Sequence, residues 1–307
     1  MPFVIETKDT GRSTFRYKKI AEKYRCDAML LRFGDCNILW DVDFACTAPF
    51  VIDALRSELR GETLDYILLS HSHYDHCAGA PYIQEVFPEV KVIAAVHAAE
   101  VFRKESTRAR MLRLDDALAV RRGHAPAPRE TFAKIHADIA VKDNDVLMLG
   151  SHPVRVIEVP GHTRDSVCYW FTEENVLLGT ETLGVYRHGE FGLAMLVGYG
   201  LTVSSMQKVM ALPIGAFMLP HGAGIIYGEE ACRAYLAEAV RGAEKTKDSI
   251  VSVFEEGNWA EETIEKATRM IVETGDYYDP SMIKARELNG TIMVRQMYEE
   301  FQHGIHP

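Results

Sequence analysis

The sequence predicts a mixed fold of strands and helices, α/β or α+β, with a helical extension at its C-terminal end. Short apolar runs flanked by Gly, Asp or Asn recur through the first two thirds of the chain and are typical of strands. These runs are residues 28–33, 37–42, 64–69, 90–95, 154–159, 167–171 and 176–178. Helix-length segments at residues 49–59 and 78–86 lie between several of the runs. Because strands and helices are interleaved, the pattern excludes a plain β-sandwich.

Two longer stretches interrupt this alternation. Residues 98–138 are rich in Ala, Arg, Leu and Glu and have a Pro-rich break at 124–128, which indicates a helical insertion. From residue 228 onward, apolar residues recur at helical spacing through 232–254, 264–272 and 283–301. We therefore expect a main domain over residues 1–227, with its insertion at about 98–138, and a helical extension over residues 228–307.

The composition is that of an ordinary globular protein and points away from nucleic acid. The chain has 307 residues, of which 47% are hydrophobic and 25% charged. Its 44 acidic and 34 basic residues give a net charge of −10, which repels a phosphate backbone at long range. Basic clusters near residues 108–113 and 121–122 have helical spacing and indicate solvated helix faces. A small-molecule substrate is the expected partner, and the sequence leaves open whether the chain forms a homodimer.

The sequence gives no indication of a membrane segment or of disulfide stapling. About 18 consecutive uncharged apolar residues are needed to suggest a membrane-spanning helix, and no such run occurs. The N-terminal residues lack the charged start and apolar stretch of a secretion signal. Six cysteines are scattered without paired spacing, which is typical of a reducing compartment. We therefore expect a cytoplasmic protein without a membrane partner.

A dense group of potential metal ligands follows the strand predicted at residues 64–69. His71, His73, Asp75 and His76 lie within six positions. Imidazole and carboxylate are ligands that zinc, iron(II) and manganese accept, and a strand-to-helix turn can direct neighbouring side chains at two different points. The alternative, a His-rich surface turn, does not account for so many ligand types at this spacing. The motif therefore predicts a site for two metal ions.

Three further polar residues occupy comparable positions downstream. His162, Glu181 and His221 each follow an apolar run and are bracketed by Gly or Pro. Such strand-ending loops commonly carry functional side chains, and each of these residues taken alone could equally be structural. In combination with the first motif, the three residues complete a metal site. The other histidines are interpreted as surface or packing residues: His97, His124, His136, His152, His188, His303 and His306.

This set of residues resembles the signature of the metallo-β-lactamase superfamily. The resemblance implies a four-layer αβ/βα sandwich with the site at its edge, and two divalent metal ions per chain, which are zinc, iron or manganese. The ligands that it implies are His71, His73 and His162 for one ion and Asp75, His76 and His221 for the other. Glu181 would bridge the two ions, although an Asp is normal at this place in the superfamily. Cys77 is a second departure from the pattern and is interpreted as a small buried thiol.

Within the superfamily, the arrangement of the insertion and the extension resembles a thioesterase branch. The interval from His76 to His162 is much longer than in glyoxalase II and the quorum-quenching lactonases, because it contains the helical insertion. The most similar layout is that of the Pseudomonas quinolone-signal response protein, a thioesterase whose helices cover the active-site entrance. This resemblance implies substrate-pocket residues at Arg108, Leu112, Asn289 and Thr291.

The implied chemistry is hydrolysis by a metal-bridging hydroxide, since two cations lower the pKa of a shared water towards ~7. A thioester or ester of a small acyl substrate is the leading candidate, with Asp75 as the catalytic residue that orients the water and returns a proton to the leaving group. Tyr74 and Tyr186 are weaker proton donors, because packing explains both. A phosphodiesterase, a lactonase and a regulatory binding protein with a residual metal site remain as alternatives. A flavodiiron protein is disfavoured, because such proteins have Glu at the position of His73 and carry a flavodoxin domain.

Overall fold

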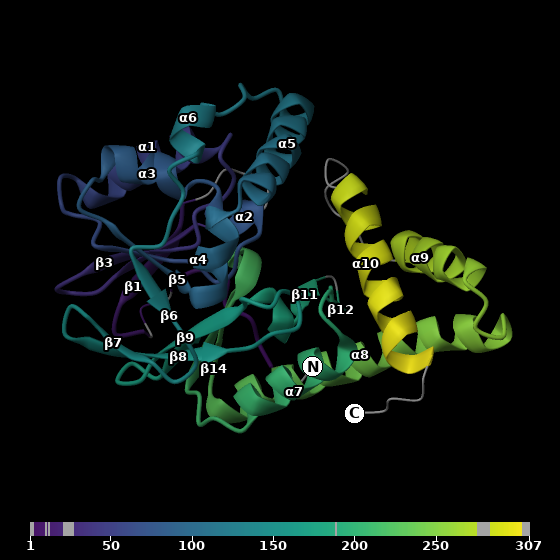
Figure 1. Ribbon diagram of the computed structural model, residues 1–307. Helices are drawn as coiled ribbons and strands as arrows, with labels where there is room; N and C mark the ends of the chain where they lie inside the picture. Colours follow the sequence, from purple (N-terminus) through teal and green to yellow (C-terminus); the bar gives the residue numbers. More distant parts are fainter. Residues whose placement is uncertain are drawn as a thin grey trace.

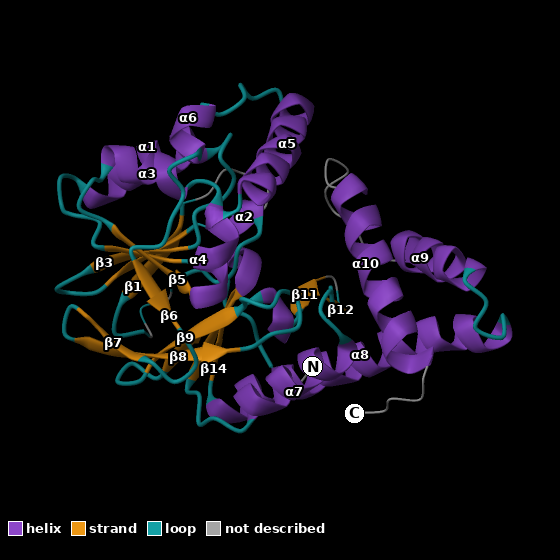
Figure 2. Cartoon of the chain, in the orientation of Figure 1, coloured by secondary structure: helices purple, strands orange, loops and turns teal. Residues whose placement is uncertain are grey.

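Two six-stranded β-sheets form the centre of the molecule in the computed structural model (Figures 1 and 2). The structure describes residues 3–9, 11, 13–20, 28–187, 189–274 and 283–302. The first sheet has the strand order β1 (Arg16–Lys19), β2 (Met29–Arg32), β3 (Asn37–Trp40), β4 (Tyr66–Leu68), β5 (Lys91–Ala95), β6 (Ile139–Val141). The second has the order β14 (Gly224–Tyr227), β13 (Ala216–Leu219), β10 (Val176–Leu178), β9 (Val167–Phe171), β8 (His152–Glu158), β7 (Val146–Leu149). A separate hairpin pairs β11 (Val185–Arg187) with β12 (Glu190–Gly192).

Helices cover the outer faces of both sheets and complete a four-layer sandwich (Figure 2). Three helices belong to the side of the first sheet: α1 (Ala48–Leu59), α2 (Tyr74–Cys77) and α3 (Ala80–Val86). Two helices lie against the second sheet: α7 (Tyr199–Met210) and the N-terminal part of α8 (Glu229–Glu256). The predicted α/β class and the layered architecture are therefore confirmed.

Successive side chains along the strands of the second sheet alternate between two apolar layers of the core. Tyr169 and Phe171 of β9 point into the core between the sheets, whereas Cys168 packs on the side of α7 and α8. The same division separates Met218 from Phe217 on β13. Successive side chains of a strand face opposite sides, so apolar residues at every position bury both faces of the sheet. This explains why these strands are continuous apolar runs in the sequence.

The structure also contains elements that the sequence did not reveal. All seven predicted strands are present, but β1, β6, β7, β11, β12, β14 and helix α7 were not predicted, and β13 was expected only as an apolar run that ends before His221. Strand β1 has the sequence RYKK, and only Tyr17 of its four residues is buried. Strand β7 is an edge strand in which Val146 and Met148 are 64% and 60% exposed. Edge strands need little apolar surface, and their hydrophobic signal is correspondingly weak.

The insertion consists of three helices. They are α4 (Val96–Arg103), α5 (Glu105–Arg122) and α6 (Arg129–Phe132), and the Pro-rich break separates α5 from α6 as predicted. Asp115 of α5 is completely buried and accepts the backbone N–H of Cys46 at 3.1 and 3.2 Å. Cys46 lies two residues before the start of α1, so this carboxyl group attaches the insertion to the main domain.

The buried Asp115 should make stability depend on pH. Burial raises the pKa of its carboxyl to about 6, against an ordinary value of 3.8, although hydrogen bonds from Cys46 oppose the shift. The folded state therefore binds the proton more tightly, and this stabilisation is present below about pH 4 and is lost as the pH rises through about 6. Relative to Asp115→Asn, the free energy of unfolding of the wild type should fall by about 2 kcal/mol between about pH 4 and pH 7.

Urea unfolding of both proteins at the two pH values measures this difference. Asp248 is the matched control, because its side chain is 70% exposed and pairs with its neighbour Lys247. The Asp248→Asn variant should follow the wild type at both pH values. Equal pH dependence in wild type and Asp115→Asn would contradict the prediction.

The C-terminal extension is formed by α8, α9 (Glu262–Thr274) and α10 (Ile283–Gln302), which pack around a small apolar core that also includes Met195 of the main domain (Figure 1). Several side chains connect α10 to the main domain, among them Phe301, whose ring lies 5.8 Å from that of Tyr199. Glu300 accepts the backbone N–H groups of Tyr199 and Gly200, both at 2.8 Å, and so satisfies the first turn of α7. In the described ranges, every helix is too short or too polar to span a lipid bilayer.

Candidate metal centre

Four of the ligand candidates come from the loop and short helix that follow β4: His71, His73, Asp75 and His76. This strand lies between β3 and β5 in the parallel part of the first sheet, so its loop emerges at the carboxyl edge. His71 and His73 lie on the loop, and His76 lies on the short helix α2 that begins after His73. The strand-to-helix turn thus directs the three imidazoles from one element, as the motif predicted.

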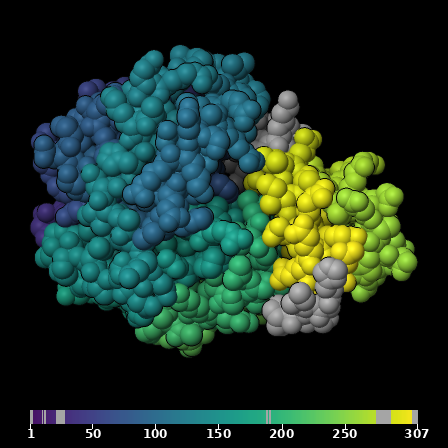
Figure 3. All heavy atoms as spheres, in the orientation of Figure 1, coloured from purple at the N-terminus to yellow at the C-terminus, as the bar shows by residue number. Residues whose placement is uncertain are grey.

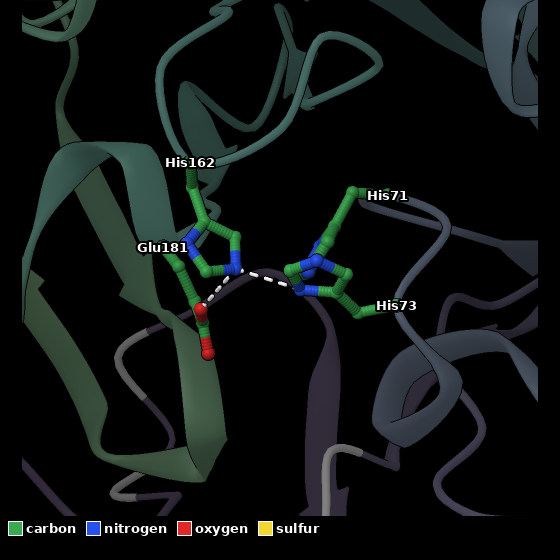
Figure 4. Close-up of side chains that lie close together, drawn as sticks. All are labelled: His71, His73, His162 and Glu181. Atoms are coloured by element: carbon green, nitrogen blue, oxygen red, sulfur yellow. Dashed lines mark hydrogen bonds and ion pairs between the residues drawn. The ribbon is translucent and has the colours of Figure 1, made fainter. Parts of the chain in front are cut away.

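The second sheet supplies the remaining ligands from three strands that run in the same direction. β10 is parallel to β13, and β9 is antiparallel to both β8 and β10. Their carboxyl ends therefore lie at one edge. His162 follows β8, while Glu181 and His221 lie in the single-turn helices η1 (Glu181–Leu183) and η2 (Pro220–Gly222) that follow β10 and β13. Figure 4 shows the side chains of His162 and Glu181 facing those of His71 and His73.

The side chains form two groups that share one carboxylate. In the first group, ligand atoms of His71, His73, His162 and Glu181 all lie within 4.8 Å of one another. His162 Nε2 is 2.8 Å from His73 Nδ1 and 2.5 Å from Glu181 Oε2. The second group consists of His76, Glu181 and His221. In this group Glu181 Oε1 contacts His221 Nε2 and lies 3.6 Å from His76 Nε2.

Asp75 lies beside the second group without belonging to it. Its Oδ2 atom is 3.7 Å from His76 Nε2, and its side chain is 21% exposed. Cys77 is fully buried, and its thiol donates a hydrogen bond to the Ser72 carbonyl at 3.5 Å. The interpretation of Cys77 as a small buried thiol is confirmed.

A buried carboxylate that the sequence analysis missed orients both histidine groups. Asp41 follows β3 and is 1% exposed. It accepts the backbone N–H and the hydroxyl of Ser70, each at 2.8 Å, and Ser70 Oγ in turn lies 3.0 Å from His71 Nδ1. Asp41 Oδ2 also lies 2.9 Å from His76 Nδ1. This network assigns the protons to both Nδ1 atoms and leaves the Nε2 lone pairs directed at the site.

His162 is oriented in the same way by a backbone group. Its Nδ1 atom donates to the Ala194 carbonyl at 2.9 Å, which leaves Nε2 for the site. A metal-bound histidine characteristically donates its other N–H to a carboxylate or carbonyl. The cue for Asp41 was present in the sequence, because it is an acidic residue at the end of an apolar run. Nothing in the sequence near residue 194 marks the carbonyl.

The donor set fits divalent metal ions. Within the described part of the chain, His71 Nε2 is buried and has no hydrogen-bond partner. Burial lowers the pKa of His71 well below its ordinary value and that of His73 to about 3, so both rings are neutral. Burial raises the pKa of Glu181, but attraction by His162 and His221 outweighs it and keeps the carboxyl ionised. Neutral imidazoles such as those of His71 and His73, beside an ionised carboxylate, are the ligands that zinc, iron(II) and manganese accept.

Asp41→Asn should weaken metal binding without unfolding the protein. Asn has the same size and tolerates the positive φ of 52° at this position, but it lacks the charge that holds His76 and Ser70. Loss of such a partner typically costs about 10- to 100-fold in metal affinity or activity. Chelator competition for zinc measures the change. Asp53→Asn, at a carboxylate that is 79% exposed, should bind as the wild type does; equal affinity in both variants would contradict the role of Asp41.

The residues suggested for the substrate pocket lie on the expected helices. Arg108 Nη1 donates to the Phe102 carbonyl at 2.7 Å, and Leu112 is 7% exposed within the main core. Asn289 is partly buried on α10, and Thr291 donates to the Glu287 carbonyl at 2.7 Å. The two hydrogen bonds are made inside the insertion and inside α10 and do not test substrate binding. The role of these four residues in the substrate pocket therefore stays a prediction. Of the other histidines, His188, His303 and His306 lie outside the described residues.

Comparison with known proteins places the chain in a family. Residues 22–228 match the model of the metallo-beta-lactamase superfamily. A hydroxyacylglutathione hydrolase of Francisella tularensis is 29% identical over 140 residues, covering 43% of this chain and 42% of its own length. An atrochrysone carboxyl ACP thioesterase of Aspergillus fumigatus is 25% identical over 159 residues, covering 52% of this chain. The chain thus spans 42% and 38% of the length of these two relatives.

Solved structures show the same fold over nearly the whole chain. A metallo-beta-lactamase family protein from Thermus thermophilus superposes with a TM-score of 0.64 at 16% identity, covering 95% of this chain and 94% of that one. An archaeal superfamily protein from Sulfolobus tokodaii has a TM-score of 0.56 at 17% identity and covers 92% of this chain. The family match spans well over half of the sequence and contains every ligand candidate. The chain therefore belongs to the metallo-β-lactamase superfamily, as its motif predicted.

Proposed function

We propose that this protein is a metal-dependent hydrolase that cleaves a thioester or ester of a small acyl substrate at a centre for two divalent metal ions. The observation that carries the proposal is the position of Glu181, whose two oxygens face different histidine groups. One ion would be held by His71, His73 and His162. The other would be held by His76, His221 and Asp75, with Glu181 shared between them.

The chain's own residues have defined tasks in such a reaction. When bound, the two ions would supply hydroxide at neutral pH and polarise the scissile carbonyl group. Asp41 and the Ala194 carbonyl hold the imidazoles in place, so little reorganisation is needed during the reaction. Asp75 is partly exposed beside His76, where its carboxylate can accept a proton from water and return it to the leaving group.

The thioester is favoured by the leaving group and by the named relatives. A thiolate departs with little help from an acid, which suits a site whose tyrosines are used in packing. The ring of Tyr74 lies 5.3 Å from Phe44, and that of Tyr186 lies 5.4 Å from Phe3. The Francisella and Aspergillus relatives are named as a hydroxyacylglutathione hydrolase and an acyl carrier protein thioesterase.

The two helical additions are positioned to shape the entrance. In the space-filling view, a hollow lies between the blue atoms of the insertion and the yellow atoms of α10 (Figure 3). Helices α5 and α10 stand on the two sides of this hollow (Figure 1). We assign Arg108 and Leu112 on one side, and Asn289 and Thr291 on the other, to the wall of the substrate pocket.

The direct test compares three substrates on the same protein. The initial hydrolysis rate of an aromatic acyl thioester is measured beside those of an activated phosphodiester and a lactone, after reconstitution with zinc, iron(II) or manganese(II). A metal-dependent preference for the thioester by more than about tenfold, ~1.4 kcal/mol, supports the proposal. Preference for the diester would identify a phosphodiesterase, and faster opening of a lactone would identify a lactonase. Absence of turnover with every metal would favour a regulatory binding protein with a residual metal site.

A further inference from the structure

A second group of potential metal ligands lies at the opposite edge of the sandwich. Asp35 and Cys36 lie in the turn between β2 and β3, and His152 is the first residue of β8. Glu174 lies in the turn between β9 and β10. The candidate metal centre described above is built on residues that follow β8 and β10, whereas His152 begins β8 and Glu174 precedes β10. The two groups are therefore separated by the length of the strands.

The geometry of this group is that of a small metal site. Ligand atoms of Asp35, Cys36 and His152 all lie within 4.8 Å of one another. His152 Nε2 is 2.8 Å from Asp35 Oδ1, and the ring of His152 packs on that of Phe33 with 4.5 Å between centroids. Cys36 is 4% exposed, and the Asp35 side chain is 44% exposed. The group is thus enclosed on the protein side and open to solvent at the carboxylate.

Glu174 contacts the ring nitrogen of His152 that does not face Asp35. Its Oε1 atom lies 2.5 Å from His152 Nδ1, and its side chain is only 7% exposed. The other oxygen, Oε2, is buried and without a hydrogen-bond partner in the described part of the chain. A buried carboxylate that accepts Nδ1–H directs the Nε2 lone pair outward and makes it a stronger ligand. Asp41 acts on His76 in the same way at the other edge.

The donor types indicate which cation fits. A thiolate, an imidazole and a carboxylate together are characteristic ligands of zinc, whereas calcium and magnesium take oxygen ligands. Zinc sites with three protein ligands complete their tetrahedron with water.

We propose that Asp35, Cys36 and His152 bind a zinc ion that is separate from the candidate metal centre. Binding of the ion releases two protons to solvent. One is the proton between His152 Nε2 and Asp35, and the other is the thiol proton of Cys36. The ion joins the β2–β3 turn to the start of β8 and thereby links the first sheet to the second. The inference does not depend on the proposed hydrolase function.

Cobalt(II) substitution of the full-length protein tests this site, because a cobalt–thiolate bond gives a charge-transfer band that imidazole and carboxylate ligands do not give. The ligand candidates at the other edge contain no cysteine, so the band reports on a cysteine-containing site alone. We expect the band in the wild type, its loss in Cys36→Ser, and its displacement by zinc. Asp35→Asn, at an exposed position, should keep the band but weaken cobalt binding by at least about tenfold.

Two cysteine variants serve as matched controls. Cys77 lies beside the metal-binding motif and Cys26 lies outside the described residues, so both are alternative sources of a thiolate. Cys77→Ser and Cys26→Ser should keep the band. The circular dichroism spectrum of Cys36→Ser should match that of the wild type, which separates loss of the site from unfolding. A wild type without the band, or a band that survives in Cys36→Ser, would overturn the proposal.

Discussion

Replacing His73 by alanine should lower the hydrolysis rate by at least about a thousandfold, ~4 kcal/mol of transition-state stabilisation. His73 Nδ1 lies 2.8 Å from His162 Nε2 and within 4.8 Å of ligand atoms of His71 and Glu181. The substitution removes one of three imidazoles from the first group, and an ion with two remaining imidazoles is held weakly. His73 is also only partly buried, so its loss creates a smaller cavity than the loss of His71 or His76.

Initial rates and bound metal per chain measure the effect, and circular dichroism checks that the fold is intact. His97→Ala is the matched control, because His97 is 42% exposed on α4 and pairs with Glu100 at 3.5 Å. It should keep full activity and full metal content. If folded His73→Ala hydrolyses the substrate at the wild-type rate, the proposed centre is wrong. If His73→Ala has no hydrolase activity but its biological effect equals that of the wild type, the interpretation as a regulatory binding protein gains support.

The sequence was sufficient for the parts of the site that depend on residue type. His71, His73 and His76 could be assigned because three imidazoles in six positions have few structural explanations. His162, Glu181 and His221 could be assigned because each interrupts an apolar run at a strand end. Such interruptions are costly unless the side chain has a partner, so the pattern carries physical information. The structure brings all six residues together in two groups that share Glu181.

Parts of the structure that depend on tertiary contacts could not be predicted. The order of the strands in the two sheets and the partner of each buried carboxylate are set by packing between distant segments. Asp115 is an example, since its hydrogen bond to Cys46 crosses from the insertion to the main domain. His152 was interpreted as a surface or packing residue, because neither Asp35 nor Glu174 is close to it in sequence. The structure places it between both carboxylates.

Glu181→Gln should reduce the number of tightly bound metal ions from two per chain to one. Glutamine keeps the size of the side chain but cannot supply the negative charge that both histidine groups share. The first group retains the three imidazoles of His71, His73 and His162 and should keep its ion. The second group retains His76 and His221. Asp75 lies beside this group, with its Oδ2 atom 3.7 Å from His76 Nε2. We therefore expect the ion near His221 to be lost, and activity to fall by at least about 100-fold.

Glu181→Asp separates the effect of charge from that of length. Aspartate is normal at this place in the superfamily, but here the side chain extends from η1 with one oxygen on His162 and the other on His221. Shortening by one carbon–carbon bond, about 1.5 Å, keeps the charge but withdraws both oxygens. We expect one ion to bind as in the wild type and the other about 10- to 100-fold more weakly.

Metal analysis after dialysis against graded chelator distinguishes the two variants. Glu100→Gln is the control, since this carboxylate is 55% exposed on α4. Two ions bound with wild-type affinity in Glu181→Asp would mean that the backbone adjusts and that the additional methylene is not required. Two tightly bound ions in Glu181→Gln would contradict the proposal that both ions share the negative charge of Glu181. A carboxylate can bridge two cations only when it is ionised and both of its oxygens take part.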